Sequence, residues 1–289
     1  MQDLGTLGND SYGTGVNTSG TAVGFSDHAD GRLRGFIWTA SAGMQEIGTL
    51  GWHTVPLGIS DTGVVFGYWY PTVGSSSYRP LRCTAADCMQ DLGTLGGNYA
   101  VASAMKNAGR IIGSSSLPGD RVTHGFFWPA STAMVDIGTG GDYAGPRAIN
   151  DSGVVVGSGS TTGNQQTHAF QWTQSGGMQD LGTLVGNYSE ATAINVSGQV
   201  TGQSYDASNQ LKAFLYTPGG IMVAIPAPFS LARRTRPGGP AISRNAVLGH
   251  FATTCPAPSR KRKGTGFDHD GFSTIRVRTH DSESRFRRP

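Results

Sequence analysis

Carboxylates recur along this chain about every 44 residues, and carboxylates can do acid–base chemistry or bind Ca²⁺. They stand in the motif MQDLGT and its relatives, at Asp3, Glu46, Asp91, Asp136 and Asp180. A side chain that returns in every repeat is more simply explained by a structural task, such as accepting hydrogen bonds from a neighbouring turn. We therefore expect these carboxylates to stabilise the repeat and not to catalyse a reaction.

Two histidines, His124 and His168, occupy equivalent positions in consecutive repeats. Other repeats have Arg34, Arg79 or Lys212 there. A basic residue at the start of a strand explains this column better than a metal site does. The other five histidines show no ligand spacing, and the segment FDHDG at 267–271 lacks most oxygen ligands of a Ca²⁺ loop. The sequence therefore indicates neither a metal nor a cofactor.

Glycine-rich segments are also present, at 93–98 and 138–142, but neither is followed by Lys-Ser/Thr or by a helix. The segment GSGS at 157–160 lacks the spacing of a nucleophile elbow. No catalytic residue is predicted, and we expect a protein that is not an enzyme.

Two of the three cysteines, Cys83 and Cys88, flank an expected tight turn between strands. Facing positions there could satisfy disulfide geometry, and a disulfide would agree with an oxidising, extracellular setting. A pair of reduced thiols is the alternative. Cys255 would be unpaired if the disulfide forms.

A repeat must position all these residues. After each MQDLGT-like motif comes a turn and an apolar run ending in Gly, as in ISDTGVVFG at 59–67, and then an aromatic cluster, as in HAFQWT at 168–173. The cluster places large aromatic side chains in register, at Trp38, Trp128, Trp172 and Tyr216. We expect these aromatic residues to pack between neighbouring repeats, because they bury large apolar areas.

Each repeat predicts four short strands, because β-branched and aromatic runs alternate with Gly, Pro, Asn, Asp and Ser. In the fifth repeat the expected strands are 191–195, 199–204, 213–217 and 222–225. Four strands in about 44 residues are the unit of a β-propeller blade. We predict an all-β propeller of four-stranded antiparallel blades over 1–277, with six blades.

The two ends of the repeat array leave alternatives open. Residues 1–7 match a fourth strand and could be a latch that closes the ring, or the mark of a truncated chain. Residues 229–277 are expected to form a degenerate sixth repeat, whose segment 272–277 could supply its own fourth strand. Residues 278–289 are expected to be a basic, disordered tail.

Charge is divided unevenly along the chain. Residues 1–229 hold nine Lys and Arg against fifteen Asp and Glu, whereas residues 230–289 hold thirteen against four. The basic segment 260–263 has no interleaved aromatic residues, so nucleic-acid binding is not favoured. We expect no membrane span and no signal peptide in this chain.

Together, DLGTLGG at 91–97, INDSGVVVG at 149–157 and His168-Ala169-Phe170 resemble the HAF-repeat family of extracellular proteins. The resemblance covers about residues 1–225 well and 240–277 weakly. It implies a secreted or surface-exposed repeat protein and brings no catalytic residues.

We predict a non-enzymatic exported scaffold that binds a protein, glycan or surface component through its blade loops. The alternatives are a propeller enzyme of glycosidase, lyase or lactonase type, and a fragment without function of its own. Carboxylates or histidines found in single blades and converging at one end would favour the enzyme.

Overall fold

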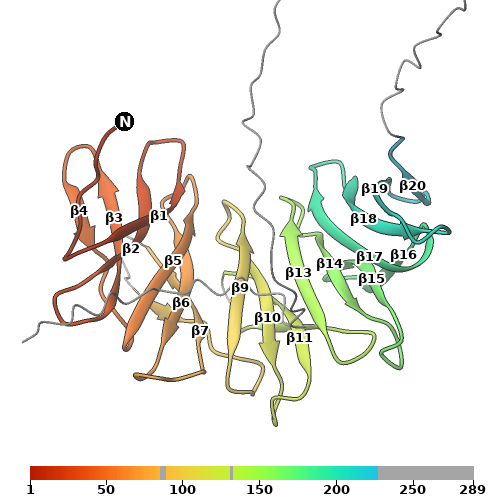
Figure 1. Cartoon of the computed structure of the whole chain (residues 1–289), viewed down its shortest axis with the longest axis horizontal. Coiled ribbons are helices and arrows are strands. Elements are labelled where there is room, and N and C mark those ends of the chain that lie inside the picture. Colours follow the sequence, from red (N-terminus) through yellow and green to blue (C-terminus); the bar gives the residue numbers. More distant parts are fainter. Residues whose placement is uncertain (85–88, 131–132, 227–289) are drawn as a thin grey trace, which may run out of the picture. The chain divides into compact units, whose positions relative to one another are not determined.

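The computed structural model describes residues 1–84, 89–130 and 133–226. The described residues belong to one compact unit of the chain. They form twenty strands and no helix (Figure 1), so the prediction of an all-β protein is confirmed.

The strands follow one another in groups of four, each an antiparallel sheet in chain order, here called a blade. The first three blades are β1 (Ser11–Val16), β2 (Ala22–Asp27), β3 (Leu33–Thr39), β4 (Gly43–Glu46); β5 (His53–Ile59), β6 (Val65–Tyr70), β7 (Arg79–Cys83), β8 (Gln90–Asp91); and β9 (Ala100–Met105), β10 (Ile111–Ser116), β11 (Thr123–Trp128), β12 (Val135–Gly138). The next two are β13 (Ala144–Ile149), β14 (Val155–Ser160), β15 (Thr167–Thr173), β16 (Gly177–Gly182); and β17 (Val185–Ile194), β18 (Val200–Asp206), β19 (Leu211–Tyr216), β20 (Met222–Ala224). A parallel pairing of Thr167 with Tyr188 joins the fourth and fifth blades.

Three pairs of consecutive blades contact one another through their first strands: β1 contacts β5, β9 contacts β13, and β13 contacts β17. The second and third blades meet through contacts of β6 and β7 with β9. Packed four-stranded antiparallel sheets of this kind are propeller blades, as predicted. Residues 1–7 form no strand, and the sixth repeat and basic tail at 229–289 lie outside the described residues. The number of six blades and the latch therefore stay predictions.

The core repeats with the blades. The centre of each third strand buries one large apolar side chain, at Phe36, Leu81, Phe126, Phe170 and Phe214, each at most 2% exposed. The predicted aromatic column lies nearby: Trp172 packs on Phe127 of the preceding blade, with ring centroids 5.4 Å apart, and Trp128 packs near Phe66. Trp128, Trp172 and Tyr216 are buried, whereas Trp38 in the first blade is half-buried.

The presence of glycine at the end of each apolar run has a steric explanation. In all five described blades the first strand carries an irregularity in its pairing with the second. In the third blade it brings the Val101 carbonyl oxygen against Gly113, and a Cβ built on Gly113 would overlap that oxygen. Only glycine fits such a close backbone approach without a shift of the strands.

The turns between first and second strands are linked from blade to blade. Asn17 Nδ2 donates to the Ser60 carbonyl oxygen at 3.1 Å, and Asn150 Nδ2 donates to the Asn195 carbonyl oxygen at 3.2 Å. The backbone amide of Thr18 donates to Asp61 Oδ1, and the backbone amide of Asp61 donates to Asn107 Oδ1. We call this set of bonds the turn ladder; each bond joins residues 43 to 46 positions apart.

Candidate functional site

The repeated carboxylates are engaged in turns. The backbone amide of the glycine two residues later donates to the carboxylate at Asp3, Asp91, Asp136 and Asp180, over 2.7–2.9 Å. Asp and Asn side chains commonly stabilise turns in this way. The donating glycines have positive φ, which explains why glycine recurs two residues after this Asp.

The same carboxylates lie close to the basic residues that occupy equivalent positions in the repeats. His124 Nδ1 lies 2.8 Å from Asp136, and His168 Nδ1 lies 2.7 Å from Asp180. Arg79 and Asp91 are 3.2 Å apart, and Arg34 and Glu46 are 3.5 Å apart. In each pair the acidic residue stands twelve residues after the basic one. Both columns are visible in the sequence, and this constant spacing is the signal that could have predicted their pairing.

The predicted disulfide lies only partly within the described residues, because Cys88 falls outside them. Cys83 is buried at 1% exposure, in the register position that Trp128 and Trp172 hold in other blades. The Cys83–Cys88 disulfide stays a prediction.

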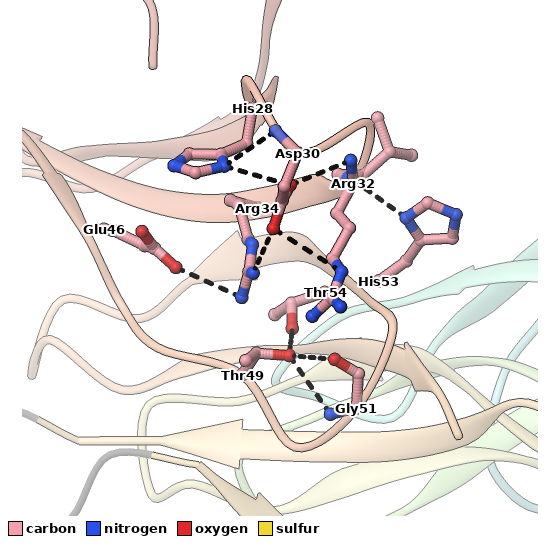
Figure 2. Close-up of polar contacts among 10 residues, drawn as sticks. His28, Asp30, Arg32, Arg34, Glu46, Thr49, Gly51, His53 and Thr54 are labelled. Atoms are coloured by element: carbon pink, nitrogen blue, oxygen red, sulfur yellow. Dashed lines mark hydrogen bonds and ion pairs between the residues drawn. The ribbon is translucent and has the colours of Figure 1, made fainter. Parts of the chain in front are cut away.

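A charged cluster surrounds Asp30, in the loop between β2 and β3 (Figure 2). Asp30 Oδ2 accepts a hydrogen bond from Arg34 at 2.7 Å, and Asp30 Oδ1 accepts one from the backbone amide of Arg32 at 3.1 Å. His28 Nδ1 lies 2.9 Å from Asp30 Oδ1. The second blade contributes His53, whose Nδ1 accepts the backbone amide of Leu33 at 2.8 Å.

These contacts limit what the cluster can do chemically. The hydrogen bond from Arg34 holds the pKa of Asp30 well below its usual range, so Asp30 is neither a proton donor nor an effective base at neutral pH. Burial lowers the pKa of His53, and the positive charges of Arg32 and Arg34 lower it further. His53 is therefore neutral at pH 7, and since Nδ1 accepts the Leu33 amide, its proton lies on Nε2.

An aromatic run continues from this cluster across the second blade into the third. We use this name for Trp52, His53, Tyr68, Tyr70, Tyr78 and Tyr99, whose neighbouring rings lie 5.7–6.0 Å apart. The Arg32 guanidinium covers Trp52 at 4.3 Å from the ring centroid. All six side chains are half-buried. Burial raises the pKa of Tyr68 to about 12, so its phenol is uncharged at pH 7.

Removal of the Arg34 charge tests the electrostatics of this cluster. We expect Arg34→Gln to raise the pKa of Asp30 towards its ordinary value, because the strongest hydrogen bond to the carboxylate is lost. A depressed carboxyl pKa stabilises the folded protein above the unfolded pKa, and this stabilisation is lost as the pH falls through the folded pKa. In the Arg34→Gln variant we expect the stabilisation by ionised Asp30 to be lost at a higher pH than in the native protein.

The measurement is an NMR pH titration of the Asp30 carboxyl carbon. Arg110→Gln is the matched control, because it removes the same charge from a side chain that donates to the Asp151 carbonyl oxygen in another blade. An unchanged Asp30 titration in Arg34→Gln would contradict the assignment.

This region was not predicted from the sequence, in which His28 and His53 are two of the five histidines without ligand spacing. Within residues 1–84, 89–130 and 133–226, no three His, Cys, Asp or Glu side chains are grouped to hold a metal ion. That same part of the chain has no helix long and apolar enough to cross a membrane.

No family model matches this chain, and no curated protein matches it. The resemblance to HAF repeats therefore stays a prediction. Among solved structures, the putative TolB of Agrobacterium tumefaciens aligns with a TM-score of 0.47 and 14% identity, over 74% of this chain and 80% of that chain. A puromycin hydrolase aligns at 0.48 and 14%, over 71% of this chain and 35% of its own. A gluconolactonase from Xanthomonas campestris aligns at 0.37 and 13%, over 77% and 82%. Likenesses this weak assign no activity to the chain.

Proposed function

We propose that this protein is a non-enzymatic, exported repeat scaffold that binds a protein partner through the aromatic run. The observation that carries the proposal is the run itself, six half-buried aromatic rings in contact across two blades, with Arg32 stacked at one end. Trp, Tyr and Arg are the residues most enriched at the energetic centres of protein interfaces.

The loops beside the run support this proposal, because they are held in place before any partner binds. Asp30 is bonded to Arg34 and to the Arg32 backbone, and Leu33 is bonded to His53. A loop ordered in this way loses less conformational entropy on binding than a mobile one.

The enzyme alternative is less well supported. His28, Asp30 and His53 do converge in a way particular to these two blades, as an active site would. However, Asp30 is saturated with donors, and Nδ1 of His53 is occupied by a backbone amide. Asp30 and His53 are therefore not available as general bases, so the enzyme alternative would depend on His28 alone.

Export is the part of the proposal that depends on sequence. It is supported by the resemblance to HAF repeats and by the pair Cys83 and Cys88, which would form a disulfide in an oxidising compartment. A mass measurement without reducing agent on protein secreted from cells would test it, and three free thiols would contradict it.

The binding proposal is tested with a phage-displayed peptide library and a glycan array as probes. We expect peptides selected on the native protein to bind the double variant Trp52→Ala, Tyr70→Ala about thirtyfold more weakly or worse, because truncation removes interface anchors. Tyr12→Ala is the matched control, since Tyr12 is 48% exposed and stacks on Phe25 outside the run. Equal peptide binding by the double variant, or ligands found only on the glycan array, would refute a protein-binding run.

A further inference from the structure

A cavity of about 420 Å³ lies where the third blade passes into the fourth. Thr139 and Gly140 line it from the segment between β12 and β13. The remaining lining residues come from β14, the loop after it, β15 and β16. The cavity is distinct from the aromatic run, and none of its residues was assigned a function above apart from the paired His168 and Asp180.

The cavity arises because the fourth blade departs from the repeat at two facing positions. In the four other described blades, the residue after the loop threonine is leucine: Leu7, Leu50, Leu95 and Leu184. In three of them its backbone amide donates to a buried serine on the second strand, at 2.8–2.9 Å, and these serines are Ser26, Ser115 and Ser204. The fourth blade has Gly140 in place of the leucine.

The facing serine is replaced as well. Gly159 pairs with His168 as Ser115 pairs with His124, so Gly159 occupies the serine position. Leu95 and Leu184 pack against the cores around Phe126 and Phe214, whereas the core around Phe170 has no leucine from this loop. Loss of both side chains leaves an opening above Phe170.

The lining combines hydroxyl groups, a hydrogen-bonded pair of His168 and Asp180, and some apolar surface. Ser160 and Thr162 bring hydroxyls, whereas the Thr161 hydroxyl is bonded to the Gln166 backbone. Met178 brings apolar surface, and Phe170, at 2% exposure, closes the floor. Asp180 is bonded to His168 and to the Gly182 amide, and His168 Nε2 is bonded to Gln166 at 2.8 Å. The lining residues include no Lys or Arg, and the polar groups of His168 and Asp180 are engaged by hydrogen bonds within the protein.

We propose that this cavity binds a neutral, polyhydroxylated ring the size of a monosaccharide. Hydroxyl groups that both donate and accept match Ser160 and Thr162, and the C–H face of such a ring matches the Met178 side chain. A volume of about 420 Å³ is near the lower end for small-molecule sites, which suits one ring. The proposal is independent of protein binding by the aromatic run.

The test restores the residues of the other blades in the double variant Gly140→Leu, Gly159→Ser. A Cβ on Gly159 would lie 3.1 Å from the Tyr143 carbonyl oxygen, which requires only a small shift, whereas one on Gly140 would lie 2.7 Å from the Ser160 carbonyl oxygen. The hydroxyl introduced by Gly159→Ser could accept the amide of residue 140, as the Ser115 hydroxyl accepts that of Leu95. The segment around residue 140 is therefore expected to take the conformation that the equivalent segment around Leu95 has in the third blade.

The probes are D-glucose, D-galactose, D-mannose and N-acetyl-D-glucosamine, measured singly by saturation-transfer NMR and calorimetry. We expect at least one to bind the native protein and to lose tenfold or more in affinity in the double variant. Two single substitutions provide a second test if the double variant does not fold. His168→Gln should weaken binding, and His124→Gln, the same change in a blade without this cavity, should not.

Three results would overturn the proposal: no sugar binds the native protein, binding survives filling of the cavity, or His124→Gln weakens binding as much as His168→Gln. Sugar binding that is lost in Trp52→Ala, Tyr70→Ala but kept in Gly140→Leu, Gly159→Ser would place the sugar on the aromatic run. That outcome would also refute the cavity proposal.

Discussion

Replacement of Phe126 by alanine is expected to lower the free energy of unfolding by about 3–5 kcal/mol. Phe126 is fully buried at the centre of the third blade and packs with Ile111, Trp128 and Leu92. Removal of its ring would take away the transfer free energy of a large apolar side chain and leave a cavity that the β-sheet cannot readily close. Urea unfolding, followed by tryptophan fluorescence, measures the effect.

The matched control is Leu211→Ala, a truncation of a side chain that is 49% exposed at the start of β19. We expect this change to cost less than about 0.5 kcal/mol, as surface substitutions commonly do. If Phe126→Ala cost as little as Leu211→Ala, the third strand would not have the register described here.

Replacement of Gly113 by alanine is expected to destabilise the protein by about 3 kcal/mol, although it adds a single methyl group. The new Cβ would overlap the Val101 carbonyl oxygen, and this oxygen belongs to the neighbouring strand, so no side chain can rotate to make room. β9 and β10 would have to separate, which weakens their hydrogen bonds. The same urea experiment measures the change.

Gly13→Ala is the control for this prediction, because Gly13 also lies in a strand but has no atom within 4 Å of the Cβ that would be added. We expect a change within about 0.5 kcal/mol of the native protein. A similar effect of both substitutions would show that loss of glycine flexibility, and not overlap with the carbonyl, governs the response.

The repeat allowed much of the fold to be predicted, because its landmarks lie on strands and turns. In the fifth blade the second, third and fourth strands are close to the predicted ranges, as in Val200–Asp206 against 199–204. The first strand was predicted to begin at 191 but begins at Val185. Its early part pairs irregularly with β18, between Val185 and Ser189, and no alternation of side chains marks such a segment.

The candidate site could not be predicted from the same landmarks. Trp52, Tyr70, Tyr78 and Tyr99 lie near the ends of strands, where the repeats differ most. The run reaches Tyr99 only after the second and third blades have packed together. The cavity is even harder to predict from the sequence, because it arises from two small residues, Gly140 and Gly159. Both look like ordinary turn and strand glycines in the sequence.

The turn ladder has a consequence for how such a chain can change in length. Its bonds join equivalent turns of adjacent repeats, as Asn17 joins Ser60 and Asn150 joins Asn195. A duplication or deletion of one repeat length in the gene would join a turn to another of the same kind, wherever in the repeat the event began. The protein could then gain or lose whole blades while the turns at each new junction kept their hydrogen bonds. Related chains are therefore expected to differ in the number of repeats more readily than in the length of a repeat.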